Sequence, residues 1–170
     1  MAITRLGPNQ SINLASNITG TLPVGNGGTG ATSFAPGKVL QVVQGNTATQ
    51  VAHSTSYADT GLTASITPSS TSNKILIMVD QHLFTQGDSG GSIKLLRDTT
   101  SIYAPPVTYA FYIDGASADP RNYHSFSFLD TPSSTNSLAY KTQGIAYNST
   151  AFQTQNNSIK SFITLMEVAG

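Results

Sequence analysis

From residue 38 onward, short apolar runs alternate with polar residues, and turn-forming residues separate the runs. Leu62, Ala64 and Ile66 alternate with threonine and serine until Pro68 ends the run. A repeat of two residues is the pattern of a β-strand with one buried face. Such runs recur roughly every 8–15 residues, a spacing typical of a sandwich or barrel. The pattern predicts an all-β fold, an antiparallel, jelly-roll-like β-sandwich over residues 38–170.

The composition agrees with this fold class. Glu167 is the only glutamate, and strong helix formers are scarce, whereas Thr, Val, Ile, Tyr and Phe are plentiful. Thr, Ser, Asn and Gln make up 63 of the 170 residues, a composition that could also indicate disorder. A hydrophobic content of 38%, with seven Tyr and seven Phe, is enough to build a core, so we expect residues 38–170 to fold.

Low charge excludes several kinds of partner. Charged residues are 9% of the chain, and eight basic side chains balance eight acidic ones. This balance supplies no basic field for nucleic acid and no polybasic patch for a membrane surface. No apolar run approaches the ~18 residues of a membrane-spanning helix. We therefore expect neither nucleic-acid binding nor membrane insertion.

Residues 1–37 differ from the rest of the chain. They contain one charged residue, Arg5, together with seven Gly and three Pro, and their large apolar residues stand singly. A segment of this kind cannot close a core of its own, so its apolar residues need another surface. We predict an extended N-terminal attachment arm that docks on a partner or a sister subunit. Its expected contact residues are Ile3, Leu6, Ile12, Leu14, Ile18, Leu22 and Val24.

Two further patterns make specific structural predictions. Residues 74–84 contain five consecutive apolar residues, which indicates a central strand covered on both faces. Gly45-Asn46, between the runs 39–44 and 49–55, indicates a hairpin turn.

The last predicted strand, residues 159–168, also has two apolar faces. Only one face can meet the core of its own subunit, so the other is expected to meet a neighbouring subunit. The residues predicted at this subunit interface are Phe162, Ile163, Leu165 and Met166.

Two motifs raise the question of catalysis or metal binding. The segment 87–91 (Gly-Asp-Ser-Gly-Gly) resembles the nucleophile segment of chymotrypsin-like proteases, but His53 and Ser89 are far closer in sequence than that family's histidine and serine. Asp80 and His82 share a strand face, yet no third ligand is evident. We expect no catalytic residues, no metal site and no cofactor.

One segment carries a family resemblance. Residues 20–32, GTLPVGNGGTGAT, resemble the LPV-x-x-GGTG segment of tail fibres and other fibrous virion proteins of tailed bacteriophages, marine and cyanobacterial phages among them. The stretch 60–77 and the ending FITLME at 162–167 are similar to a β-domain of the same proteins.

The resemblance implies a homotrimeric virion protein whose arm attaches to the particle and whose β-domain projects. Gly27, Gly28 and Gly30 would let three chains approach closely near an axis. The function expected is a short trimeric tail fibre or fibre tip that binds a host surface glycan through its loops. Because 170 residues leave almost no room for a shaft, a capsid decoration protein or head fibre is the alternative. The expected surface-binding residues are Tyr103, Tyr109, Tyr112 and Tyr123.

Overall fold

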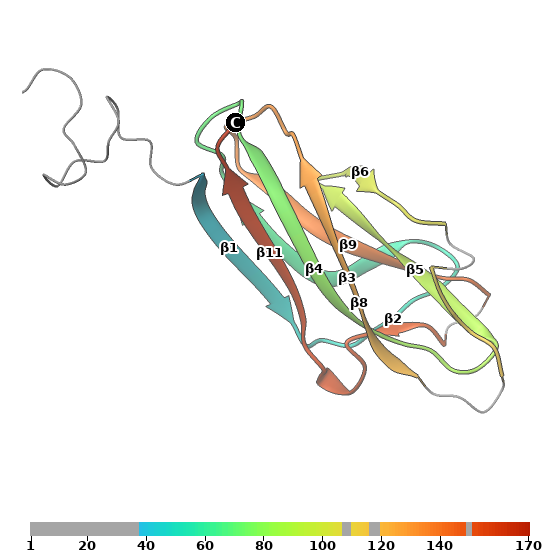
Figure 1. Ribbon diagram of the computed structural model, residues 1–170. Helices are drawn as coiled ribbons and strands as arrows, with labels where there is room; N and C mark the ends of the chain where they lie inside the picture. Colours follow the sequence, from blue (N-terminus) through green and yellow to red (C-terminus); the bar gives the residue numbers. More distant parts are fainter. Residues whose placement is uncertain (1–37, 107–109, 116–119, 149–150) are drawn as a thin grey trace, which may run out of the picture. The chain divides into compact units, whose positions relative to one another are not determined.

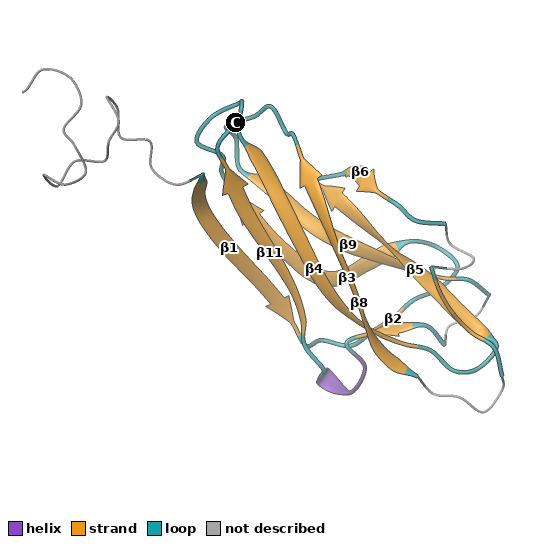
Figure 2. Cartoon of the chain, in the orientation of Figure 1, coloured by secondary structure: helices purple, strands orange, loops and turns teal. Residues whose placement is uncertain are grey.

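The computed structural model describes residues 38–106, 110–115, 120–148 and 151–170, and residues 38–170 form one compact unit (Figure 1). This unit is all-β, and its one described helical element is the short 3-10 turn η2, Asn156–Ser158 (Figure 2). The strands are β1 Val39–Thr47, β2 Val51–Ala52, β3 Ala58–Ile66, β4 Lys74–Phe84, β5 Ser89–Arg97, β6 Thr100–Tyr103, β7 Phe111–Ile113, β8 Arg121–Asp130, β9 Leu138–Ala146, β10 Gln153–Thr154 and β11 Ser161–Val168.

The strands form two antiparallel sheets. In sheet A, β4 pairs with β8 on one side and with β11 on the other, and β1 pairs with β11. The short strands β2 and β10 pair with each other, and β10 pairs with the end of β4, so they extend the lines of β1 and β11. In sheet B the order is β3-β9-β5, and β6 and β7 pair with different parts of the same β5 edge. The two antiparallel sheets confirm the predicted all-β class.

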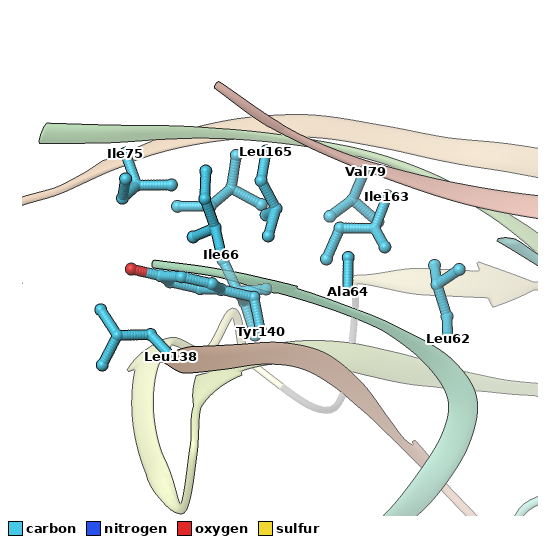
Figure 3. Packing of buried hydrophobic residues seen from close by; sticks show 11 residues of the cluster. Leu62, Ala64, Ile66, Ile75, Val79, Leu138, Tyr140, Ile163 and Leu165 are labelled. Atoms are coloured by element: carbon cyan, nitrogen blue, oxygen red, sulfur yellow. The ribbon is translucent and has the colours of Figure 1, made fainter. Parts of the chain in front are cut away.

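The core lies between the two sheets and contains the inward residues that alternation predicts. Leu62, Ala64 and Ile66 of β3 meet Ile163 and Leu165 of β11, and all five are at most 8% exposed (Figure 3). A second cluster, Leu83, Ile93, Ala146 and Phe152, continues the core toward the end of the sandwich where β4 and β9 finish. Alternation therefore identified the buried face of β3.

Contacts between the sheets close both sides of the sandwich. On one side, Gly45 of β1 lies so close to the carbonyl oxygen of Thr63 in β3 that a Cβ there would clash. On the other side, Arg97 Nη1 donates to Asp130 at 2.8–2.9 Å, and the Tyr140 hydroxyl donates to Asp130 at 2.7 Å. Burial, reinforced by the hydrogen bond to Asp130, raises the pKa of Tyr140.

The expected hairpin at Gly45-Asn46 is wrong. β1 runs through both residues and pairs with β11, and β2 pairs with β10 instead of turning back on β1. Glycine occupies position 45 because β3 approaches it closely, and a turn is not the reason. Close approach and turn formation select the same residue type, which is why the sequence was misread here.

The two ends of the sandwich differ. Residue 38, the C-terminus and the connections 67–73, 98–99 and 131–137 lie at one end, which we call the base (Figure 1). Residues 85–88, 114–115, 120, 147–148 and 155–160 lie at the opposite end, which we call the loop end (Figure 2). The two ends of the sandwich are therefore built from different parts of the chain.

The buried carboxylate of Glu167 connects three elements at the base. Glu167 in β11 is fully buried and accepts hydrogen bonds from Ser69 N, Ser69 Oγ and Asn73 Nδ2 at 2.6–2.8 Å and from Gln41 Nε2 at 2.6 Å. These bonds connect β1, β11 and the connection between β3 and β4. Burial by itself raises the pKa of Glu167, but the hydrogen bonds outweigh it and lower the pKa to about 2.

Glu167→Gln should destabilise the fold by about 1–3 kcal/mol at pH 7, because the new amide NH₂ would face the NH₂ of Gln41. Since the pKa is about 2 in the folded state and 4.5 ordinarily, the carboxylate stabilises the fold above pH 4.5 and loses this effect as the pH falls toward 2. Urea unfolding of both proteins from pH 7 to pH 2 measures this. The stability difference should shrink below pH 4.5; a constant difference would contradict the assignment.

Buried polar side chains fill the space between the sheets nearer the loop end. Thr142 Oγ1 donates to Gln81 Oε1 at 2.8 Å, Gln81 Nε2 donates to Ser161 Oγ at 3.0 Å, and Thr60 Oγ1 lies 2.6 Å from Thr142 Oγ1. This network connects strands of both sheets. Beside it, the ring of His53 is 1% exposed, and burial lowers its pKa to about 4.

Glycine at position 144 makes room for this histidine ring. A Cβ on Gly144 would lie 2.7 Å from Cε1 of His53 and 2.8 Å from its Nε2, which itself lies 3.1 Å from Thr154 Oγ1. The ring therefore has little freedom to move away, because its contact with Thr154 fixes its position.

Gly144→Ala should destabilise the domain by about 1–3 kcal/mol through overpacking. In the double variant His53→Ala/Gly144→Ala the clashing ring is absent. The double variant should therefore lose less unfolding free energy than the two single variants lose in sum. Denaturant unfolding of the wild type, both single variants and the double variant measures the coupling. Strict additivity would show that His53 is not the group that excludes a side chain at position 144.

Candidate functional site

The outer face of sheet A carries an unusual number of apolar side chains. Ile75, Ile77 and Val79 of β4 point into the core, so the alternating residues Leu76 and Met78 lie on the outer face. The neighbouring strands add further apolar residues to that face. We define the apolar face as Val42, Leu76, Met78, Leu129, Phe162, Met166 and Val168.

The strand register aligns part of this face into one row. Val42 of β1 pairs with Met166 of β11, Met166 pairs with Leu76 of β4, and Leu76 pairs with Leu129 of β8. The row therefore crosses the four long strands of sheet A, β1, β11, β4 and β8. Its two end residues, at opposite edges of the sheet, are also its most exposed, Val42 at 56% and Leu129 at 53%.

Charge is sparse on this face. β1 contains no charged residue, and on β4 the outward charges are Lys74 near the base and Asp80 six residues further along. Asp80 Oδ1 accepts a hydrogen bond from Ser125 at 2.6 Å. Between these two charges the described surface is apolar or neutral.

The outer face of sheet B has the opposite character. Lys141 Nζ donates to Asp59 at 2.8 Å, and Gln143 Nε2 donates to the other oxygen of Asp59 at 2.7 Å. The hydrogen bond from Lys141 lowers the pKa of Asp59. A hollow of about 120 Å³ lies beside this cluster, smaller than the ~300–1,000 Å³ usual for small-ligand pockets. We therefore regard the outer face of sheet B as solvent-facing.

The four residues predicted at a subunit interface divide between the two sides of β11. Ile163 and Leu165 are 0% exposed and belong to the core of their own subunit, so a neighbouring subunit cannot reach them. Phe162 and Met166 lie on the outer face and belong to the apolar face. Adjacent strand residues point to opposite sides of a sheet, and this separates the two pairs.

Sequence reasoning named only two of the seven members of the apolar face, Phe162 and Met166, as interface residues. Leu76 and Met78 lie in the apolar run of β4, which we expected to be covered on both sides, yet Met78 is 37% exposed. Leu129 interrupts the alternation of phenylalanine and serine in β8, a signal that could have identified it. Val42 gave no comparable signal, because it lies in an apolar pair, Val42-Val43.

The tyrosines predicted for surface binding do not share a surface. Tyr103 packs toward the core, with its ring centroid 5.0 Å from that of Phe126. Tyr123 is 50% exposed, and its hydroxyl donates to the carbonyl of Lys160 at 2.8 Å. Tyr112, at the loop end, meets Tyr147 edge to face at 5.9 Å. Tyr109 lies outside the described residues.

The loop end therefore has an aromatic pair of which sequence reasoning found only one member. Tyr147 follows β9, is 41% exposed, and its backbone N–H donates to the carbonyl of Gly90 at 2.8 Å. Gly90 pairs with Tyr112, so the strand β5 holds both tyrosines in place. Asp88 and Asn148 lie beside them, and Asn148 Nδ2 donates to the carbonyl of Asp88 at 3.0 Å.

The residues of the protease-like and metal-like motifs are part of a strand or are buried. Ser89 lies within β5 and pairs with Ile113, and His53 is buried beside Thr154 and Phe152. His82 is 2% exposed and meets the ring of Tyr123. Across the residues that the structure describes, no three His, Asp or Glu side chains are grouped as metal ligands would be.

The predicted attachment residues Ile3, Leu6, Ile12, Leu14, Ile18, Leu22 and Val24, and the glycines Gly27, Gly28 and Gly30, lie outside the described residues. In the part of the chain that is described, no helix has the length and apolar character needed to cross a membrane. No known family profile matches the chain, and no curated protein matches its sequence.

Proposed function

We propose that this chain is a non-enzymatic structural protein of a bacteriophage virion, a short trimeric tail fibre or fibre tip attached through residues 1–37. The observation that carries the proposal is the apolar face, which crosses sheet A while the outer face of sheet B is polar. Burying such a face against sister subunits removes apolar surface from water. The resemblance of residues 20–32 to phage fibre proteins gives the assembly its proposed context.

The strand order supports a jelly-roll for the domain. Counting β1-β2, β10-β11 and β6-β7 each as one strand position, sheet A has the order β1-β11-β4-β8 and sheet B the order β3-β9-β5-β6. Strands consecutive in the chain thus tend to alternate between the sheets. Two four-stranded sheets connected in this way are the architecture of jelly-rolls, which occur in viral capsid and lectin domains.

The difference between the two ends of the sandwich supports attachment at the base and ligand binding at the loop end. Residue 38, where the arm joins, lies at the base, whereas Tyr112 and Tyr147 lie at the loop end. The exposed ring of Tyr147 and the half-buried ring of Tyr112 can stack on sugar rings, and neighbouring Asp88 and Asn148 can hydrogen-bond to hydroxyl groups. We propose a host surface glycan as the ligand of the loop end.

A capsid decoration protein or head fibre is the second candidate. The described domain follows directly from residue 37, so the chain leaves almost no length for a shaft between arm and domain. In this version the arm clamps major capsid subunits and the loop end projects from the head. Both versions use the same apolar face for self-assembly.

The oligomeric state tests the observation that carries the proposal. Met78→Lys places a charge in the middle of the apolar face, at a residue already 37% exposed, and should convert trimers to monomers without unfolding the domain. Ser65→Lys, on the outer face of sheet B, is the matched control and should leave the trimer intact. Sedimentation equilibrium measures both. A wild-type chain that stays monomeric at micromolar concentration would exclude the proposal.

Deletion of residues 1–35 tests the attachment role. The truncated chain should still form soluble trimers, because the apolar face lies entirely within residues 38–170, but it should no longer join virions. Electron cryo-microscopy of particles carrying the full-length or truncated chain measures occupancy and separates a tail location from a head location. Incorporation of the truncated chain at normal copy number would contradict the attachment role.

A further inference from the structure

The two edges of sheet A match each other chemically, row by row. β1 forms one edge and β8 the other, and the register of β11 and β4 between them aligns their outward residues. Val42 shares a row with Leu129, Gln44 with Ser127, and Asn46 with Ser125. Each row thus ends in an apolar pair or in an amide opposite a hydroxyl, and no row pairs two like charges.

The strand directions also match. β1 is antiparallel to β11, β11 to β4, and β4 to β8, so β1 and β8 run in opposite directions within one sheet. When identical subunits surround an axis that runs along their strands, the β8 edge of one subunit meets the β1 edge of the next. The two edges then lie antiparallel and at the same height, because rotation about the axis does not shift the rows.

A contact about a two-fold axis would not join the β1 edge of one subunit to the β8 edge of another in this way. Face-to-face packing about a two-fold axis brings each surface patch against itself, with the strands of one subunit reversed relative to the other. The exposed residues at the ends of the apolar row would then meet their own counterparts or the centre of the partner's sheet. The observed row, with its most exposed apolar residues at opposite edges, fits a ring of subunits better.

We propose that the trimer is a closed ring in which the Val42 edge of each subunit packs against the Leu129 edge of the next, with the apolar face turned toward the axis. This inference rests on the trimer of the proposed function and specifies its contact. In the ring, Leu76, Met78 and Met166 surround the axis, whereas Gln44 and Asn46 approach Ser127 and Ser125 of the neighbour. The polar outer face of sheet B stays in solvent.

The chain has no cysteine, so introduced cysteines report this contact directly. In Val42→Cys/Leu129→Cys, a short bismaleimide should join three chains covalently, because each subunit offers one cysteine to each neighbour. Neither single variant should cross-link. Ser65→Cys/Ser101→Cys, with exposed positions on the edge strands of sheet B, is the matched control and should remain uncross-linked.

A second pair tests the register. Ser125 lies four residues from Leu129 along β8, a separation of about 13 Å, so Val42→Cys/Ser125→Cys should cross-link far less than the pair in the same row. If the cysteine variants fail to fold, a charge exchange replaces them. Val42→Lys and Leu129→Glu should each dissociate the trimer, and the double variant should restore it in sedimentation equilibrium.

The outcomes separate this inference from the proposed function. Cross-linking of Leu129→Cys alone into pairs of chains would establish a two-fold contact and overturn the ring. A trimer in sedimentation whose Val42 and Leu129 positions do not cross-link would overturn the contact and leave the trimer standing. A monomeric wild-type chain would overturn both the ring and the trimer.

Discussion

The whole architecture depends on the fact that β4 is apolar on both faces while a two-sheet sandwich can bury only one of them. Ile75, Ile77 and Val79 enter the core, where they meet residues of β3 and β11. Leu76 and Met78 necessarily point outward, and the flanking strands place Met166 and Leu129 beside Leu76. The central strand thus generates both the core of the subunit and the surface that we propose joins subunits.

Buried polar groups fix how the two sheets meet. The Glu167 carboxylate holds β1 and β11 to the connection between β3 and β4, and Asp130 connects β8 with Arg97 and Tyr140 of sheet B. Because buried donors and acceptors are costly when unpaired, these contacts favour one packing of the sheets over its alternatives. The alignment of the apolar row depends on the strand register within sheet A.

Much of the fold could be predicted from the sequence, but little of the candidate site. Alternation identified the buried residues of β3, and a run of five apolar residues identified the central position of residues 74–84, because both patterns are local in the sequence. The hairpin at Gly45 was wrong because close approach by β3 and turn formation both select glycine. Tyr103, Tyr112 and Tyr123 could not be placed, because the surface that a side chain reaches depends on pairings between strands distant in sequence.

The residue pattern alone was enough to predict that residues 38–170 form β-strands and that the last strand has apolar residues on both faces. The structure was needed to show that Ile163 and Leu165 fill the core, that Phe162 and Met166 face outward, and that Val42, Met166, Leu76 and Leu129 share one row. The period of a strand is set by residues that are neighbours in the sequence, whereas the register between strands arises from hydrogen bonds between segments far apart in the chain.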